Sequence, residues 1–421
     1  MLDIKFIREN SDLIRAGAKK KYLEFDVDKL LEADKERLAL MTEIEGMRAK
    51  QNQVSTEITK TSFETRAALI ESMKVIKEEM QKKEEVLSGV MKKWRDLMLA
   101  VPNVPDISVP EGATDKENVE MRTWGEPKKF PFQPKGHIDL MQSLDLVDFD
   151  RGVKVAGFRG YFLKNDAARM SMAIWQLVMD ELVLKGFTPM IVPSLVRREA
   201  FMGTGYLPQS EEDLYKTQDE NYLSGTAEVA TMGYYMDEIL RGEELPKKML
   251  SFNSCYRREA GSHGKDAKGL YRVHEFNKVE QVVICEASHE VSVKLHEELT
   301  GNAEMLLQKL GLPYRVVVNC GGDLGLGQVK KYDIETWIPS EERYGETHSS
   351  SYFHDFQTRR LNIRYRDAEG KLRFAHSLNN TALATPRLLI SIIENYQNED
   401  GTVTVPEVLR KYLGKDVVRG A

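Results

Sequence analysis

Cysteine is scarce in this sequence. Only three cysteines occur among 421 residues, and no two of them form a CxxC pair, so the chain encodes neither a disulfide framework nor a zinc ribbon. Free cysteines tend to be buried, and thiols stay reduced inside the cell. We therefore expect buried thiols at Cys255, Cys285 and Cys320, and no zinc.

Long apolar runs are also missing. No stretch approaches the ~20 apolar residues of a membrane-spanning helix. The first ten residues, MLDIKFIREN, lack the apolar centre of a secretory signal peptide. The sequence therefore predicts a soluble, cytoplasmic protein without a membrane partner.

Two common phosphate-binding loops are absent, since the chain contains neither GxGxxG nor GxxxxGK[ST]. A formal net charge of −6 argues against a protein coated in basic residues for non-specific nucleic-acid binding. The 41% hydrophobic and 30% charged residues exclude a disordered chain and predict a sizeable core. At about 150 residues per domain, the length is typical of two or three domains.

The first hundred residues carry a different pattern from the rest. From about residue 28 to 59, and again from 69 to 97, apolar side chains recur at alternating steps of three and four around a polar break. An average step of 3.5 is typical of coiled coils, and two helices of about thirty residues would each be roughly 45 Å long. We expect an antiparallel two-helix arm, either a dimerisation stalk or an arm that reaches for a large partner.

Three prolines, Pro102, Pro105 and Pro110, end the helical region and divide the chain into expected domains of residues 1–105 and 106–421. Beyond them, strand-like runs follow one another through short turns, which is typical of a mainly antiparallel sheet with flanking helices in an α+β fold. We expect helices at about residues 166–185, 228–241, 287–310 and 382–396, and strands at 248–257, 279–285, 314–320, 332–338, 361–366 and 372–377, the last two joined by a hairpin turn at 367–370.

The segment of residues 253–284 is the densest in chemistry. Residues 254–278 hold six basic and three acidic side chains around a glycine-rich loop. Arginine stays charged and can bind phosphate or carboxylate oxygens through two parallel hydrogen bonds. The segment therefore predicts a site for a polyphosphate or a nucleic-acid end, with a charged surface hairpin as the alternative.

Three short motifs in this segment, REAGS, HEF and KVE, resemble motif 2 of the class II aminoacyl-tRNA synthetases and are similar to the form seen in seryl-tRNA synthetases. The likeness continues, nearly end to end and in order, in five further places. These are the N-terminal MLDIKFIREN with the long arm, motif 1 at residues 182–196, LSGTAE at 223–228, GETHSSSYFHDFQTRR at 345–360, and motif 3 with the tail from 376 onward. The resemblance implies a class II catalytic domain behind a coiled-coil arm that binds tRNA, in a homodimer.

The activity that the resemblance implies is serine–tRNA ligation. L-serine and ATP give seryl-adenylate and pyrophosphate, and serine passes to the 3′ end of tRNA(Ser), with tRNA(Sec) left open as a second substrate. Attack of a carboxylate on a phosphate needs positive charge where the two anions meet. The resemblance assigns catalysis to Arg257, which bridges the serine carboxylate and the α-phosphate, and to Arg387, which stacks on adenine or binds the γ-phosphate.

ATP binding is expected to involve side chains from three segments. Glu346 and Ser349 would supply oxygen ligands for the Mg²⁺ that accompanies ATP. Phe276, with Val273 beside it, offers a ring for adenine, and Glu259 would hold the adenine or orient the arginines. The expected ATP-binding residues are Arg257, Arg258, Glu259, Val273, Phe276, Glu346, Thr347, His348, Ser349 and Arg387.

Serine needs an acid for its ammonium group, which Glu228 or Glu280 can provide, and a hydrogen-bond partner for its hydroxyl. A site that must pair this hydroxyl rejects alanine and glycine, because its own polar groups would be left buried and unpaired. Candidates for the hydroxyl are Thr226, Asn379 and Thr381. The expected serine-binding residues are Thr226, Ala227, Glu228, Arg257, Glu280, Asn379 and Thr381.

The chain departs from the family pattern at a few positions. Pro386 stands where glycine is usual, but proline is tolerated in a first helical turn, so Arg387 is interpreted as retained. Lys265 and Lys268 replace common arginines, which keeps the charge and loses the paired hydrogen bonds. His348 stands in the altered EISSCS stretch and is more often a surface or packing residue.

Two competing interpretations belong to other classes. A synthetase-like binding module that has lost aminoacylation would be favoured by loss of Arg257, Glu280 or Arg387, and all three are present. A ligase that loads an amino acid onto a carrier protein would lack the coiled-coil arm, which this chain has.

Overall fold

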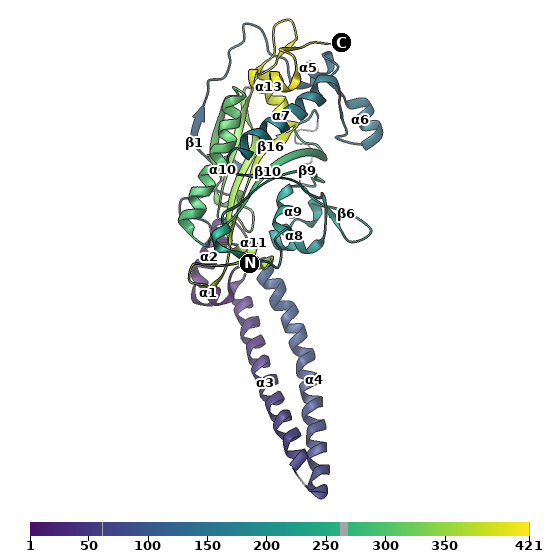
Figure 1. The fold of residues 1–421 in the computed structure, drawn as a ribbon, viewed down its shortest axis with the longest axis vertical. Helices are drawn as coiled ribbons and strands as arrows, with labels where there is room; N and C mark the ends of the chain where they lie inside the picture. Colours follow the sequence, from purple (N-terminus) through teal and green to yellow (C-terminus); the bar gives the residue numbers. More distant parts are fainter. Residues whose placement is uncertain (61, 262–267, 421) are drawn as a thin grey trace. The chain divides into compact units, whose positions relative to one another are not determined.

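The computed structural model describes residues 1–60, 62–261 and 268–420 (Figure 1). By their contacts these residues form two units, one of Met1–Lys19 with Leu23–Pro102 and one of Lys20–Tyr22 with Asn103–Ala421. No helix in the described part of the chain has the length and apolar character that crossing a membrane requires.

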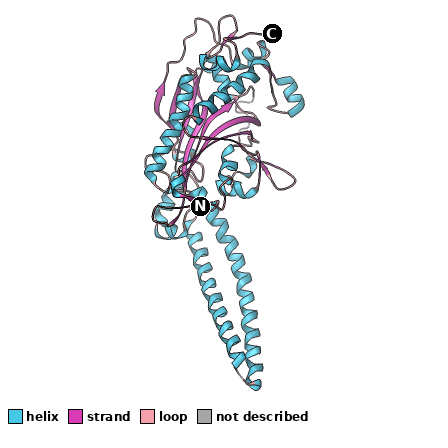
Figure 2. Ribbon diagram, viewed as in Figure 1, coloured by secondary structure: helices cyan, strands magenta, loops and turns pink. Residues whose placement is uncertain are grey.

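The first unit is helical, as Figure 2 shows. Its two long helices lie antiparallel and contact each other through ion pairs such as that between Arg48 and Glu84 at 2.7 Å. The Arg37 guanidinium lies 4.7 Å from the centre of the Trp94 ring. The expected coiled-coil arm is therefore confirmed. The helices are α1 (Ile4–Glu9), α2 (Ser11–Lys20), α3 (Val27–Lys60) and α4 (Phe63–Ala100).

The second unit is built on an eight-stranded sheet in the order β1-β11-β12-β13-β16-β10-β9-β4. Its neighbouring strands run antiparallel, except that β4 and β9 are parallel. This confirms the expected α+β fold. The strands are β1 (Val119–Trp124), β4 (Thr188–Ile191), β9 (Lys247–Tyr256), β10 (Glu275–Cys285), β11 (Tyr314–Val318), β12 (Lys330–Ile338), β13 (Arg343–His354) and β16 (His376–Thr385).

Helices α7, α10 and α12 pack against this sheet and bury their apolar faces in its core. Leu177, Leu299 and Leu389, one from each helix, are fully buried, and each such side chain contributes about 1.5–3 kcal/mol relative to exposure. The helices of this unit are α5 (His137–Ser143), α6 (Phe149–Ala156), α7 (Asn165–Val183), α8 (Arg198–Thr204), α9 (Ala227–Gly233), α10 (His289–Lys309), α11 (Phe356–Arg360), α12 (Arg387–Asn395) and α13 (Glu407–Leu413).

Short strands and single turns of 3₁₀ helix complete the unit. The short strands form four small sheets. They are β2 (Val147–Asp148), β3 (Phe162–Leu163), β5 (Leu195–Val196), β6 (Tyr215–Lys216), β7 (Tyr222–Leu223), β8 (Ile239–Arg241), β14 (Arg364–Arg366), β15 (Leu372–Phe374), β17 (Val403–Thr404) and β18 (Val417–Val418). The 3₁₀ turns are Asp115–Glu117, Glu211–Asp213, Gly242–Glu244, Gly321–Asp323 and Pro339–Glu341.

Two expected helices were wrong at one end. The helix expected at 228–241 stops at Gly233, because glycine is a poor helix former and the chain goes on to form β8, which pairs with β14. The helix expected at 382–396 begins only at Arg387, because residues 383–385 pair with β10 and Pro386 has no N–H to continue a ladder.

Two other expectations were confirmed, whereas several strands differ from the prediction. The hairpin turn at 367–370 joins β14 to β15, and the three cysteines are buried. Strands β1 and β13 were missed, and the strand expected at 372–377 is divided between β15 and β16.

Candidate active site

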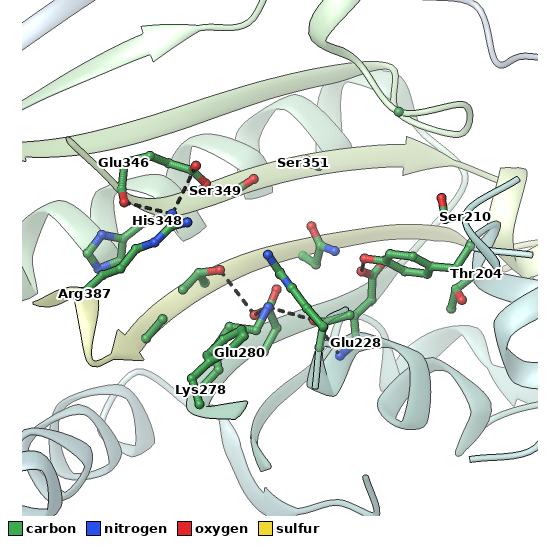
Figure 3. Close-up of a pocket in the computed structure, with 18 of the residues that line it drawn as sticks. Thr204, Ser210, Glu228, Lys278, Glu280, Glu346, His348, Ser349, Ser351 and Arg387 are labelled. Carbon is green, nitrogen blue, oxygen red and sulfur yellow. Dashed lines mark hydrogen bonds and ion pairs between the residues drawn. The ribbon is translucent and has the colours of Figure 1, made fainter. Parts of the chain in front are cut away.

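A cavity of about 280 Å³ lies over β10, β13 and β16 in the second unit (Figure 3). Alternate residues of β10, namely Phe276, Lys278 and Glu280, line it, because successive side chains of a strand point to opposite faces. Asn379 and Thr381 of β16 line it for the same reason, and Thr381 lies opposite Glu280 in the register. The sheet therefore presents one polar face to the cavity.

A β-bulge in β13 brings Glu346 and Ser349 to the same face. Glu346 pairs with Glu335 and His348 pairs with Ile334, so the ladder skips Thr347. One extra residue reverses the alternation of side chains along a strand. Two positions three residues apart, which would lie on opposite faces of a regular strand, both line the cavity.

A buried cluster of opposite charges occupies the middle of the cavity. The Lys278 Nζ lies 2.6 Å from the Glu280 Oε2 and donates to the Thr226 hydroxyl at 2.8 Å. The Thr381 hydroxyl donates to the same carboxylate at 3.4 Å. Because buried charges are tolerated only when they are paired, the cluster fixes the positions of one acid and two hydroxyls expected to bind serine, namely Glu280, Thr226 and Thr381.

A second buried acid, Glu228, lies in the first turn of α9. Its Oε1 accepts a hydrogen bond from the Gln357 amide at 2.6 Å, and its Oε2 accepts one from the Tyr206 hydroxyl at 3.0 Å. The Thr226 hydroxyl caps the helix by accepting from the Glu228 N–H. Burial, supported by the nearby negative charge of Glu280, raises the pKa of Glu228 to about 7. The carboxyl is poised to ionise when a cation arrives.

Arg257 follows the last residue of β9 and lines the cavity. Its Nε donates to the Gly225 carbonyl at 3.3 Å, and the guanidinium lies 5.2 Å from the centre of the Phe276 ring. Val273 is buried in the cavity wall. Glu259, also in the wall, forms an ion pair with Arg272 at 3.2 Å.

Arg387 and Glu346 close the other end of the cavity, on the left of Figure 3. The Arg387 Nη1 lies 3.2 Å from the Glu346 Oε2, and its Nε donates to the Tyr271 carbonyl at 3.0 Å. The guanidinium also lies 4.5 Å from the Tyr271 ring. Loss of hydration opposes ionisation of Glu346, but Arg387, Lys331 and Arg257 outweigh it and lower the pKa of this carboxyl to about 2.

His348 is buried, and its Nδ1 lies 2.8 Å from the Thr347 hydroxyl. Burial lowers the pKa of His348 to about 4, so the ring is neutral at pH 7. It can contribute a hydrogen bond and shape to the cavity wall, but no positive charge.

Most of the expected site residues come together here, and two do not. Ala227 is buried at the start of α9, and Arg258 is exposed with its N–H bound to the Asp213 carbonyl; neither lines the cavity. Lys268 is exposed outside the cavity, and Lys265 lies outside the described residues.

Sequence reasoning missed several lining side chains. Lys278 had a usable signal, because it lies between Phe276 and Glu280 at steps of two, but the strand was expected to begin only at 279. Tyr206 lies in a loop and reaches Glu228 only through the fold. Neither periodicity nor a motif identified Tyr206.

Comparisons with known proteins match the whole chain. Residues 1–105 match the seryl-tRNA synthetase N-terminal domain, and residues 214–396 match the class II tRNA synthetase core domain of the glycine, histidine, proline, serine and threonine enzymes. A serine--tRNA ligase of Deinococcus radiodurans is 46% identical over 421 residues, covering 100% of this chain and 99% of that protein. One of Thermodesulfovibrio yellowstonii is 45% identical, covering 100% of both.

Solved structures agree with these relatives. The crystal structure of seryl-tRNA synthetase from Pyrococcus horikoshii complexed with ATP has a TM-score of 0.92 and 38% identity, and it covers 100% of both chains. A cytoplasmic serine-tRNA ligase from Naegleria fowleri in complex with AMP has a TM-score of 0.88 and 32% identity, with coverage of 100% of this chain and 99% of that one.

Proposed function

The chain belongs to the seryl-tRNA synthetase family, and from this premise we propose how its cavity performs the reaction of a serine–tRNA ligase. L-serine reacts with ATP to give seryl-adenylate and pyrophosphate, and serine is then transferred to the 3′ end of tRNA(Ser). The observation that carries the proposal is one cavity in which two arginines, Arg257 and Arg387, lie with two buried acids, Glu228 and Glu280.

The serine ammonium group binds beside the two buried acids, towards the end of the cavity away from Arg387. Glu280 is already paired with Lys278, whereas Glu228 is held by two neutral donors. A cation beside Glu228 would therefore compensate a charge that the protein itself leaves only hydrogen-bonded. The serine hydroxyl pairs with Thr226, Asn379 or Thr381, all of which line the cavity.

Activation joins two anions, and the arginines make this approach favourable. The serine carboxylate attacks the α-phosphorus of ATP, the new bond forms there, and pyrophosphate leaves with the electron pair of the broken bond. Arg257, which lines the cavity, bridges the carboxylate and the α-phosphate. Its charge acts strongly in a site that excludes water. In the second step the ribose hydroxyl attacks the seryl carbonyl, and AMP leaves.

ATP occupies the remaining part of the cavity. Phe276 and the buried Val273 offer an apolar surface for adenine, and Glu259, held by Arg272, contributes a polar contact. Arg387, fixed by Glu346 and by the Tyr271 carbonyl, stacks on adenine or binds the γ-phosphate. Thr347 and His348 complete the wall as neutral groups.

Glu346 and Ser349 are the residues that would hold Mg²⁺. The donor set fits, since Mg²⁺ prefers oxygen ligands and usually keeps several waters. The low pKa of Glu346, about 2, keeps this carboxylate ionised, and the bulge at Thr347 turns both side chains to one face. The ion would neutralise phosphate charge. No zinc is part of the proposal.

A homodimer is proposed from exposed apolar residues at the edge of the sheet. Leu184 and Ile191 are each 86% exposed, and Leu195 is 51% exposed. They lie on and around the edge strand β4, within the segment that resembles motif 1. Exposed apolar patches of this kind mark protein interfaces.

The arm of α3 and α4 is proposed to bind tRNA, and the division into domains of residues 1–105 and 106–421 is part of this proposal. The arm's positive and negative charges nearly cancel. We therefore expect it to recognise the backbone and the shape of the tRNA at particular points, and not through a uniformly basic surface. We propose that the protein acts in the cytoplasm, on tRNA there.

ATP–pyrophosphate exchange with each amino acid in turn tests the proposal. Serine should support exchange, and alanine, glycine and threonine should support far less. The Arg257→Ala variant should lose exchange while its circular dichroism spectrum stays that of the parent. A well-folded parent protein that shows no serine-dependent exchange would instead support a binding module.

A further inference from the structure

A tight turn, Gly325 to Gln328, forms one wall of the cavity. The Gln328 N–H donates to the Gly325 carbonyl at 3.2 Å, and the Gln328 side chain accepts from the Gly325 N–H at 2.6 Å. The same side chain donates to the Ser351 hydroxyl of β13 at 2.8 Å. The turn is thus folded on itself and attached to the floor of the cavity.

The turn lies at the end of the cavity away from Arg387. A Cβ added at Gly327 would lie 2.6 Å from the Phe356 ring, and one added at Gly205 would lie 3.1 Å from the same ring. The turn and the loop at Gly205 therefore pack on one aromatic side chain. Next to it, Gln357 donates to the Glu228 carboxylate. The turn closes the end of the cavity at which serine is proposed to bind.

Two residues bind every carbonyl group of this turn. The Lys21 Nζ donates to the carbonyl oxygens of Gly325, Leu326 and Gln328 at 2.9, 2.9 and 2.6 Å. The Asn103 amide donates to the fourth, that of Gly327, at 2.9 Å, and the Asn103 N–H donates to Leu326 at 2.9 Å.

The Lys21 ammonium is an unusual group to find in this place. Its side chain is buried, with 2% of the residue exposed, and lysine is almost never fully buried. Three carbonyl acceptors match the three N–H groups of the charged form, whereas a neutral amine offers two. Burial opposes this charge and lowers the pKa of Lys21. The side chain nevertheless directs its hydrogen bonds at three carbonyl groups of the turn, which indicates that the turn needs this donor.

We propose that Lys21 and Asn103 are positioning residues for the serine end of the active site, which they shape by holding the turn Gly325 to Gln328 in place. The inference rests on the proposed function. Neither residue lines the cavity, so both act through the turn. Misplacing a wall of a binding site by about 1 Å can cost up to 10²-fold in rate.

The place of the two residues in the chain extends the inference. Lys21 lies in the segment Lys20–Tyr22, which has arm residues before and after it, and Asn103 is the first residue after the arm. The wall is therefore held at the points where the chain passes between the two units.

The test compares Lys21→Met with Lys19→Met in ATP–pyrophosphate exchange, varying serine and ATP separately. Lys19 is exposed and two positions away, so its variant is the matched control. In Lys21→Met we expect the KM for serine to rise about tenfold, with the KM for ATP unchanged. Asn103→Ala, which removes the donor to Gly327, should show the same selective rise.

Thermal melting of each variant accompanies the kinetics. A lower Tm with an unchanged KM for serine, or equal rises in both KM values, would overturn the positioning role. If Lys21→Met does not fold, Asn103→Ala decides by the same criterion. Absence of serine-dependent exchange in the parent protein would instead overturn the proposed function, so the two failures are distinguishable.

Discussion

Arg387 donates through one nitrogen, Nη1, to both the backbone oxygen and the carboxylate of Glu346, at 3.1 and 3.2 Å. The pair joins the first residue of α12 to β13, and the two residues are 41 positions apart in the chain. These contacts use only Nη1 of the guanidinium to hold the arginine against Glu346. The positive charge of Arg387 also lowers the pKa of the Glu346 carboxyl, which keeps it ionised. Arg387 and Glu346 are thus positioned before any substrate binds.

Replacement of Glu346 by Gln should weaken the response to magnesium. The change keeps the size of the side chain and removes the charge that would bind the ion. We expect the Mg²⁺ concentration for half-maximal exchange to rise about tenfold. Glu342→Gln, at an exposed position just before β13, is the control. An unchanged Mg²⁺ midpoint in Glu346→Gln would exclude this residue as a ligand.

Serine binding should depend on pH through Glu228. Its pKa is raised to about 7, so the carboxyl is protonated below that pH and can no longer pair with an ammonium ion. We expect the KM for serine in exchange to rise as the pH falls from 8 to 6. In Glu228→Gln the KM should be high throughout and lack this dependence.

A parent KM for serine that does not change across pH 6–8 would contradict the assignment of Glu228 to the serine ammonium group.

The pH dependence of stability gives a second readout for Glu228. Because the native pKa of Glu228 lies above the ordinary 4.5, the native state binds more protons between these values. This group therefore lowers the free energy of unfolding as the pH rises from 4.5 to 7. The Glu228→Gln variant should lose that contribution in urea titrations.

Removal of Lys278 should cost stability as well as activity. Lys278→Met leaves the Glu280 carboxylate buried without its cation, which costs about 3–5 kcal/mol. The double variant Lys278→Met/Glu280→Gln should recover much of this stability, but exchange should stay low because the Thr226 and Thr381 hydroxyls lose the charged groups that position them. Urea unfolding of Lys278→Met, Glu280→Gln and the double variant measures the energetic coupling between the two side chains. Additive losses would show that the two side chains do not stabilise each other.

The dimer can be tested at Leu184. The side chain is 86% exposed, so Leu184→Glu should leave a single chain as stable as before and disrupt an interface. Light scattering after gel filtration should show a shift from dimer to monomer. Ile107→Glu, at a side chain that is 97% exposed outside the motif 1 segment, should remain dimeric. A parent protein that is monomeric and still charges tRNA would rule the dimer out.

Local patterns predicted the arm and the polar motifs well, since a repeat of 3.5 and short motifs are properties of neighbouring residues. They failed where distant pairing decides the structure. Residues 383–385 were predicted as helix because Ala and Leu favour helices, yet their pairing with β10 makes them strand.

The site shows the same division. Arg257, Glu280 and Glu346 were found from motifs. Tyr206 meets Glu228 only because the loop at Gly205 folds beside α9. The bulge at Thr347 is invisible in the sequence, because it depends on which β12 residues the strand meets. Periodicity describes one element, and the cavity is made where several elements meet.

The buried Lys21 also changes how this protein could be dissected. A fragment that starts at residue 103 would contain the cavity. It would, however, lack Lys21, whose amino group donates hydrogen bonds to three carbonyls of the cavity wall. The three residues Lys20–Tyr22 lie within the arm's part of the sequence, but by their contacts they belong to the second unit. The arm could be exchanged between relatives only with this short segment retained. The boundary between the two units therefore follows the contacts between residues and cannot be placed at a single position in the sequence.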